Sequence, residues 1–166
     1  MAPTADGHWL LFGLNLPHLL SAFLAHDDHY RASAATYGDG GQNAIGREIG
    51  PELAHIRVRE TLRAAAMSGV EVRWLGMPDF GFSKTLDETL AVWGAPRLRD
   101  AMREVVDRVD PDIVVTNHSL TQGHGHHRAS FWAITEVLKE RAAAGKWAPP
   151  LFARCPLEQA QLVFDP

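Results

Sequence analysis

Residues 110–130, DPDIVVTNHSLTQGHGHHRAS, decide the fold that this sequence predicts. The apolar run at 113–116 (IVVT) follows a helix-breaking Asp-Pro-Asp and is typical of a short strand buried on both faces. A polar loop over 117–127 then leads into residues 126–144, where apolar side chains recur at helical spacing. Strand, loop and helix in this order predict one unit of a parallel α/β sheet.

The same alternation extends to both sides of this unit. Residues 97–109, for example, carry an apolar stripe with the charged side chains opposite it. Strands that alternate with helices predict an α/β fold with a Rossmann-like, three-layer, doubly wound and mostly parallel sheet. We expect strands at 9–14, 30–36, 70–75 and 113–116, helices from Pro17, over 51–67, 97–109 and 126–144, one short helix within 76–96, and a further strand within 147–166.

Length and composition narrow the class of protein. The 166 residues fit a single domain over 1–166, and a net charge of −4 without a Lys/Arg run argues against a nucleic-acid partner. The single cysteine, Cys155, excludes an internal disulfide and is interpreted as structural. No Gly-rich phosphate loop is present, which argues against a nucleotide-binding domain. The apolar run 9–25 has polar interruptions, so we expect no membrane span and a cytoplasmic protein, with secretion as the alternative.

Four loops collect most of the residues that can carry chemistry. They span 15–18, 36–50, 76–83 and 117–127, and each follows a predicted strand. Ligands of parallel α/β sheets bind beyond the carboxyl ends of the strands, where such loops meet. The concentration of Gly, His and loop Asp residues there predicts a functional site at this edge of the sheet.

The histidines of the fourth loop give the sharpest local signal. His124 and His127 are three residues apart, and Gly125 between them allows a tight turn at the start of a helix. Both rings can then face one pocket, which suits a metal ligand and a catalytic partner. The alternative is an exposed polar helix cap.

A second group lies in residues 25–29, AHDDH. Asp27 and Asp28, flanked by His26 and His29, can supply a metal ligand and a general base. The alternative is a solvated turn between a helix and a strand.

Four further residues are candidates for substrate binding. Arg57 shares a helix face with Glu60 near the glycine-rich loop, where the alternative is a surface ion pair. Asp79 follows a strand and can bind sugar hydroxyls or stabilise a turn. Asp39 and Asn43, in the glycine-rich loop, can contact substrate or support turns.

Longer stretches resemble the LmbE-like N-acetylglucosaminyl deacetylases, the PIG-L family. They are TYGDGGQNAIG at 36–46, IRVRETLRAAAMSGVEV at 56–72, LGMPDFGFSKTLDETLAVWG at 75–94 and residues 110–130, in family order and spacing. The resemblance implies a Rossmann-like fold and one zinc ion. It also implies that His127 is a zinc ligand, that His124 stabilises the oxyanion, and that Arg57 and Asp79 hold substrate.

The first motif of the family, His-Pro-Asp-Asp-Glu after the first strand, is not recognisable here. That place reads FGLNLPH, with Asn15 and His18 as its polar groups. If residues 25–29 fold back to the site, His26, Asp28 and His127 make a three-ligand zinc site with Asp27 as the base. Otherwise the chain is an inactive relative or a fragment, and the short carboxyl end favours a domain that is incomplete at one or both ends.

The resemblance therefore predicts a zinc-dependent hydrolase that removes acetyl groups from an amino sugar or a related conjugate. Its partner is a small molecule, it needs no organic cofactor, and its oligomeric state is open. The alternative function is a metal-free carbohydrate-binding or interaction module on the same fold.

Overall fold

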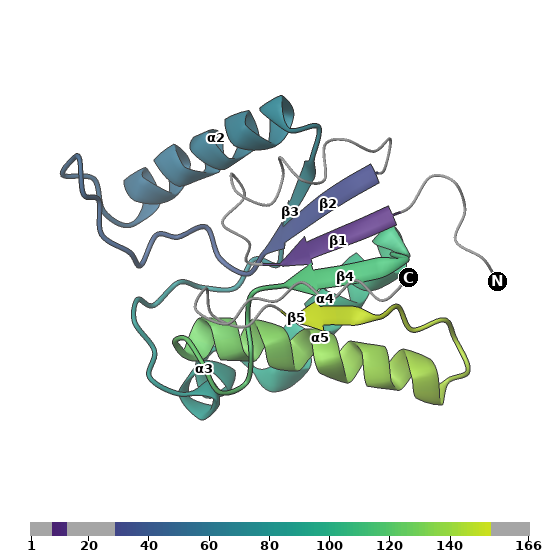
Figure 1. Ribbon diagram of the computed structural model, residues 1–166. Coiled ribbons are helices and arrows are strands. Elements are labelled where there is room, and N and C mark those ends of the chain that lie inside the picture. The colour runs from purple at the N-terminus through teal and green to yellow at the C-terminus, as the bar shows by residue number, and fades with distance from the viewer. Residues whose placement is uncertain (1–7, 13–28, 154–166) are drawn as a thin grey trace.

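The computed structural model describes residues 8–12 and 29–153. Its five strands form one sheet in the order β3-β2-β1-β4-β5, and every neighbouring pair is parallel. Figure 1 shows α2 on one side of this sheet and α3, α4 and α5 on the other. The elements are β1 His8–Phe12, β2 His29–Ala34, α2 Pro51–Met67, β3 Glu71–Trp74, α3 Leu86–Trp93, α4 Ala95–Val109, β4 Ile113–Thr116, α5 Gly125–Ala143 and β5 Leu151–Ala153.

The parallel pairing and the α/β class are as predicted, because the strands alternate with crossover helices along most of the described chain. Parallel strands bring all their carboxyl ends to one edge of the sheet. The loops that follow β2, β3 and β4 therefore meet there, at the left of Figure 1.

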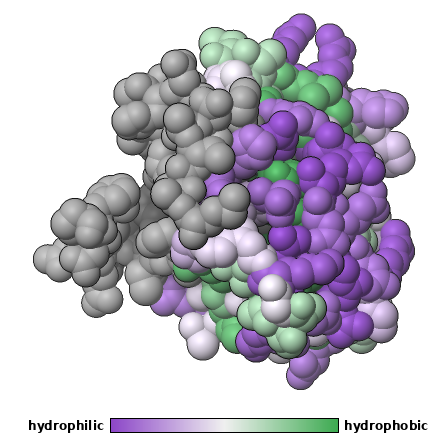
Figure 2. Space-filling view, turned by 90° about the vertical axis from the view of Figure 1, so that its right-hand side faces the viewer, coloured by the Kyte–Doolittle hydropathy of each residue, from purple (hydrophilic) through white to green (hydrophobic). Residues whose placement is uncertain are grey.

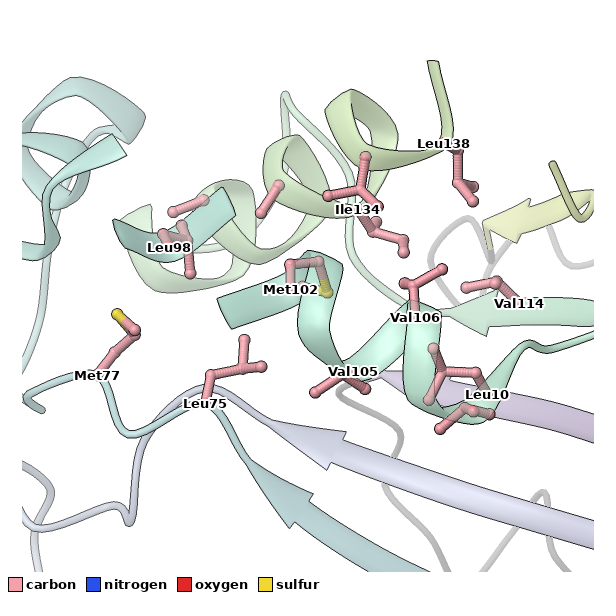
Figure 3. Packing of buried hydrophobic residues seen from close by; sticks show 14 of the residues in the cluster. Leu10, Leu75, Met77, Leu98, Met102, Val105, Val106, Val114, Ile134 and Leu138 are labelled. Carbon is pink, nitrogen blue, oxygen red and sulfur yellow. The ribbon is translucent and has the colours of Figure 1, made fainter. Parts of the chain in front are cut away.

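The core lies between the sheet and the α4–α5 pair. The buried stripe of α4 packs between α5 and the strands β1 and β4, as Figure 3 shows. The side chains at its centre have no exposed surface: Leu10, Leu98, Met102, Val106, Val114 and Val137. Burying an aliphatic side chain of this size stabilises the fold by about 1.5–3 kcal/mol, so this layer fixes the position of the first turn of α5.

The bounds of the predicted elements agree closely with the structure in this region. The predicted helix 51–67 and the strand 113–116 have the bounds that the sequence indicated. The short helix expected within 76–96 is α3, which Thr85 caps by accepting a hydrogen bond from the Glu88 backbone N–H. The strand expected within 147–166 is β5. The helix predicted from Pro17 lies outside the described residues.

One arginine ties the carboxyl-terminal half of the fold together. Arg141, near the end of α5, pairs with Asp107 at 2.5 Å and with Asp110 at 2.6 Å, both at the end of α4. Its Nε also donates to the backbone oxygen of Trp147, at 2.8 Å, in the segment that leads to β5. The side chain is buried, and buried charges are stable only when they are paired and hydrogen-bonded in this way.

The face at the amino ends of the strands has a different character. Figure 2 shows that the described residues on this face are mainly hydrophilic, with hydrophobic side chains in separate patches. In the described part of the chain, no helix combines the length and the hydropathy that crossing a bilayer requires.

Candidate active site

A pocket of about 580 Å³ lies at the carboxyl ends of β2 and β4. Its walls are the glycine-rich loop after β2, the loop after β3, the loop after β4 and the first turn of α5. This volume lies within the range of small-molecule sites, about 300–1,000 Å³. The position agrees with the edge of the sheet at which the sequence predicted a site.

Four histidines line one side of this pocket: His118, His124, His126 and His127, here called the histidine cluster. The ring centroids of His124 and His127 are 4.2 Å apart. The rings of His118 and His127 are stacked, also with centroids 4.2 Å apart. The predicted pair is therefore brought together, and a third ring lies directly against it.

Burial keeps the histidine cluster neutral near pH 7. It lowers the pKa of His118 to about 3 and that of His127 to about 4, with a further decrease from neighbouring imidazoles. Burial also lowers the pKa of His124, against an opposing effect of the Asp79 charge. It lowers the pKa of His126 in the same way, again opposed by Asp79. Neutral imidazole is the form that binds metal ions and accepts protons.

The local backbone places His124 and His127 on the same side of the turn. His124 is the N-cap of α5, and its Nδ1 accepts a hydrogen bond of 3.4 Å from the His126 backbone N–H. Gly123 has φ +81°, and a Cβ there would lie 3.0 Å from Nδ1 of His127. Glycine therefore permits both the left-handed backbone and the close approach of the His127 ring.

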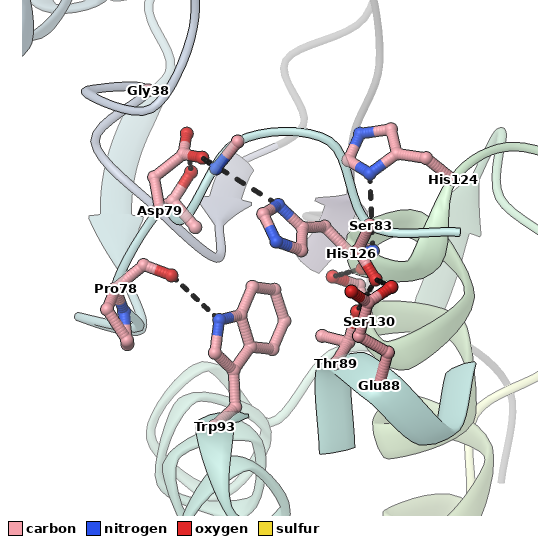
Figure 4. A network of polar contacts seen from close by, with 12 residues as sticks. Gly38, Pro78, Asp79, Ser83, Glu88, Thr89, Trp93, His124, His126 and Ser130 are labelled. Carbon is pink, nitrogen blue, oxygen red and sulfur yellow. Dashed lines mark hydrogen bonds and ion pairs between the residues drawn. The ribbon is translucent and has the colours of Figure 1, made fainter. Parts of the chain in front are cut away.

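Asp79 lies on the pocket wall next to His126. Its carboxylate accepts hydrogen bonds from Thr36 Oγ1, at 3.2 Å, and from the Gly81 backbone N–H, at 3.0 Å. Nδ1 of His126 is 3.9 Å from the same carboxylate. Figure 4 shows the His126 ring between Asp79 and Trp93. Asp79 thus stabilises its own turn, as one of the two interpretations predicted, and it also lines the pocket.

His126 itself is almost fully buried. Its ring lies edge-on to Phe80, with centroids 4.5 Å apart, and over Trp93, at 4.7 Å. Its Nε2 has no hydrogen-bond partner among the described residues. The indole N–H of Trp93 donates to the backbone oxygen of Pro78 at 2.7 Å, which holds the loop after β3 against α3.

Arg57 holds the opposite wall of the pocket. Its guanidinium reaches from α2 to the glycine-rich loop and donates to the backbone oxygens of Gly38 and, at 2.9 Å, of Gln42. The alternative ion pair with Glu60 is not found in the described residues. Asn43 supports the turn that follows: its Oδ1 accepts from the backbone N–H groups of residues 45 and 46, both at 3.1 Å.

The predicted site residues therefore fall into three groups. His124, His127, Arg57 and Asp79 line the pocket. Asp39 and Asn43 lie in the glycine-rich loop but are not among the residues that line the pocket. His26, Asp27, Asp28, Asn15 and His18 lie outside the described residues.

His118 and His126 are pocket residues that the sequence reasoning did not select. Both stand in the histidine-rich stretch 118–127, so the signal was present. Their burial and ring contacts, however, depend on Trp93, Phe80 and the stacked His127, which are brought together only by the fold.

The described residues fit one position of the predicted zinc site. The neutral imidazole of His127 fits the role of a ligand. Within 8–12 and 29–153, however, no group of three His, Cys, Asp or Glu side chains could hold a metal ion. Catalytic zinc sites use about three protein ligands. The two other predicted ligands, His26 and Asp28, lie outside these ranges.

Comparison with solved structures shows the same fold in several proteins. A 4-carboxy-2-hydroxymuconate hydratase from Pseudomonas putida KT2440 has a TM-score of 0.68 at 16% identity, over 89% of this chain and 65% of its own. The N,N'-diacetylchitobiose deacetylase from Pyrococcus horikoshii has a TM-score of 0.61 at 18% identity, over 82% and 51%. A deacetylase of the teicoplanin biosynthesis pathway has a TM-score of 0.60 at 19% identity, over 86% and 65%. The chain thus spans between half and two thirds of these proteins.

Comparison with curated protein sequences gave no significant match. A family model described as GlcNAc-PI de-N-acetylase, PIG-L, matches residues 15–138, which is most of the chain. The matched region contains the glycine-rich loop, Asp79 and the whole histidine cluster. The chain therefore belongs to the PIG-L family, as the resemblance of its sequence motifs predicted.

Proposed function

We propose that this protein is a zinc-dependent N-deacetylase that hydrolyses the acetyl amide of an amino sugar or a related conjugate. One observation carries the proposal: the neutral imidazoles of His124 and His127 line one pocket, opposite Arg57 and beside Asp79. Membership of the PIG-L family and the deacetylases among the structural neighbours support it. With it we propose a three-layer, doubly wound Rossmann-like fold for the complete domain.

The N-cap geometry indicates which proton His124 can offer. Its Nδ1 accepts the His126 backbone N–H, so the neutral ring carries its proton on Nε2. Nε2–H is then available to donate to an amide oxygen in the pocket. A donor that meets the oxygen as negative charge develops stabilises the transition state by about 3–4 kcal/mol.

The zinc ion would be held by His127, together with His26 and Asp28 from the part of the chain that is not described. When bound, it would polarise the acetyl carbonyl and lower the pKa of a water molecule. Asp27 is proposed to take the proton of that water and to pass one to the leaving amine. Asp79 and Arg57 are proposed to hold the sugar, Asp79 through its carboxylate and Arg57 by fixing the glycine-rich loop.

The charge of the pocket supports an amide of a neutral polyol over a polyanionic substrate. Among the described lining residues, Arg57 and Asp79 carry formal charges, and these cancel. The guanidinium of Arg57 is already bound to two backbone oxygens of the loop. The substrate named for the hydratase neighbour carries carboxylates, and these would find no free cation among the described lining residues. We therefore favour the deacetylase over a hydratase of that kind.

Zinc content and acetate release test the proposal together. The protein is stripped by mild chelation, refilled with zinc, and incubated with N-acetylglucosamine and N,N'-diacetylchitobiose. We expect about one zinc per chain and released acetate, both lost in His127→Ala. His55→Ala, which removes an exposed histidine of α2, is the matched control and retains both.

Two further outcomes separate the alternatives. Asp27→Asn is expected to keep the zinc and lose acetate release, because it removes a base and not a ligand. Sugar binding by a protein that takes up no zinc and releases no acetate would contradict the proposal and support the carbohydrate-binding module.

A further inference from the structure

The first turn of α5 is docked against the start of α3 through Gly125. The backbone N–H of Gly125 donates to the backbone oxygen of Ser83 at 2.8 Å. A Cβ on Gly125 would lie 2.2 Å from Ser83 Oγ, 2.2 Å from the Thr85 oxygen and 2.3 Å from Thr89 Oγ1. These distances are far below van der Waals contact, so only glycine allows the two helices to approach this closely.

A buried chain of hydroxyl groups lies under this contact. Thr89 Oγ1 is 2.8 Å from Ser83 Oγ, and Ser83 Oγ is 3.0 Å from Glu88 Oε2. Neither Ser83 nor Thr89 has exposed surface. Both hydroxyls also lie near the backbone oxygen of Thr85, Ser83 Oγ at 3.1 Å and Thr89 Oγ1 at 3.3 Å. The Glu88 carboxylate and the Thr85 oxygen can only accept, so they take hydroxyl protons from this pair. The two hydroxyl groups are thus bonded to each other and to acceptors at the start of α3, which holds both side chains in place under Gly125 (Figure 4).

The docking contact bears directly on two residues of the proposed active site. His124 immediately precedes Gly125, and His127 is two residues beyond it. Any shift of the Gly125 backbone moves both rings together. Catalysis depends steeply on such placement, since a displacement of about 1 Å can cost a hundredfold in rate.

We propose that Ser83 and Thr89 are positioning residues, which set the placement of His124 and His127 by fixing where α5 begins. They touch neither substrate nor the reacting atoms, and they act through Gly125. The kinetic consequence rests on the proposed deacetylase function, whereas the structural consequence does not.

Two substitutions at Thr89 separate positioning from packing. Thr89→Val keeps the shape of the side chain and removes the hydroxyl, whereas Thr89→Ser keeps the hydroxyl and removes the methyl group. A positioning role predicts that kcat for acetate release from N,N'-diacetylchitobiose falls at least tenfold in Thr89→Val, with KM changed less than twofold. Thr89→Ser is then expected to stay within threefold of the parent.

The imidazole signals of His124 and His127 in ¹H–¹⁵N spectra give a readout that needs no activity. They are expected to shift in Thr89→Val and to keep the parent positions in Thr89→Ser. Thr135→Val is the control, because its hydroxyl bonds to the backbone oxygen of Trp132 within α5, away from the turn. Ser83→Ala, which adds no volume, is the second variant if Thr89→Val does not fold.

Equal behaviour of the two Thr89 variants, or a larger loss in Thr89→Ser, would overturn the proposal and leave a packing role. If the parent releases no acetate, the deacetylase function has failed, and the ring signals still decide whether these hydroxyls position the histidines.

Discussion

Acidification from pH 7 to pH 5 is expected to destabilise this fold through its buried histidines. Folding lowers the pKa of His118 to about 3 and that of His127 to about 4, against about 6.5 in an unfolded chain. At a pH between the folded and the unfolded pKa, the unfolded chain binds more protons than the folded one. The free energy of unfolding is therefore highest above about pH 6.5 and decreases as the pH falls below that value.

The expected magnitude follows from these pKa values. At pH 5, each histidine with a folded pKa of 3 or 4 lowers the free energy of unfolding by about 2 kcal/mol relative to its value at pH 7. The two rings together set an upper value of about 4 kcal/mol, and partial exposure of His127 reduces it. We therefore expect the free energy of unfolding to fall by about 2–4 kcal/mol, which is a large part of the 5–15 kcal/mol typical of a domain.

Urea unfolding at pH 7 and pH 5 measures this change, at constant ionic strength and with a chelator present so that metal release does not contribute. His118→Asn should lower the pH dependence by about half, because it removes the more deeply buried ring of the stacked pair. His55→Asn, on the exposed face of α2, serves as the control and should leave it unchanged. A difference below about 0.5 kcal/mol between the two pH values, or an undiminished pH dependence in His118→Asn, would refute the reasoning.

Three further substitutions test the contacts around the pocket. Gly125→Ala should lower the free energy of unfolding, measured by thermal unfolding, by about 2–3 kcal/mol, because the new Cβ overlaps three oxygens. Gly145→Ala is the control: the space around it is open, so only its positive φ should matter, at about 1 kcal/mol. Arg57→Gln should speed proteolysis within the glycine-rich loop, since two guanidinium bonds to the loop are lost, and unchanged cleavage would count against that role. Trp93→Phe should lower the free energy of unfolding in urea by about 1–3 kcal/mol, because the Pro78 oxygen loses its indole donor; a neutral result would contradict this.

The regular elements were predictable because their signals are local. The apolar run of β4 and the Pro-initiated start of α2 gave the bounds that the structure has. The Thr85-x-x-Glu88 pattern is typical of a helix N-terminus and marks the start of α3. Only the presence of a short helix was predicted in this region, without its bounds. The predicted start of α4, at residue 97, was two residues late, because the structure begins that helix at Ala95.

The candidate site was predictable only in part. The spacing of His124 and His127 pointed to one pocket, and the fold brings their rings together. The roles of Arg57 as a brace and of Asn43 as a turn former depend on which backbone groups lie within reach, and sequence spacing does not encode that. The docking of Gly125 on α3 likewise requires two helices that contact each other only after the chain has folded.

Helix α5 is fixed at both of its ends by contacts of different kinds. Gly125 is wedged against α3 at the first turn, and Arg141 is bound to the end of α4 at the last. Nineteen residues at about 1.5 Å each make a stiff rod of about 28 Å. A rod that is held at both ends cannot slide or rotate by itself, so the imidazoles at its first turn keep a constant placement relative to α3 and α4.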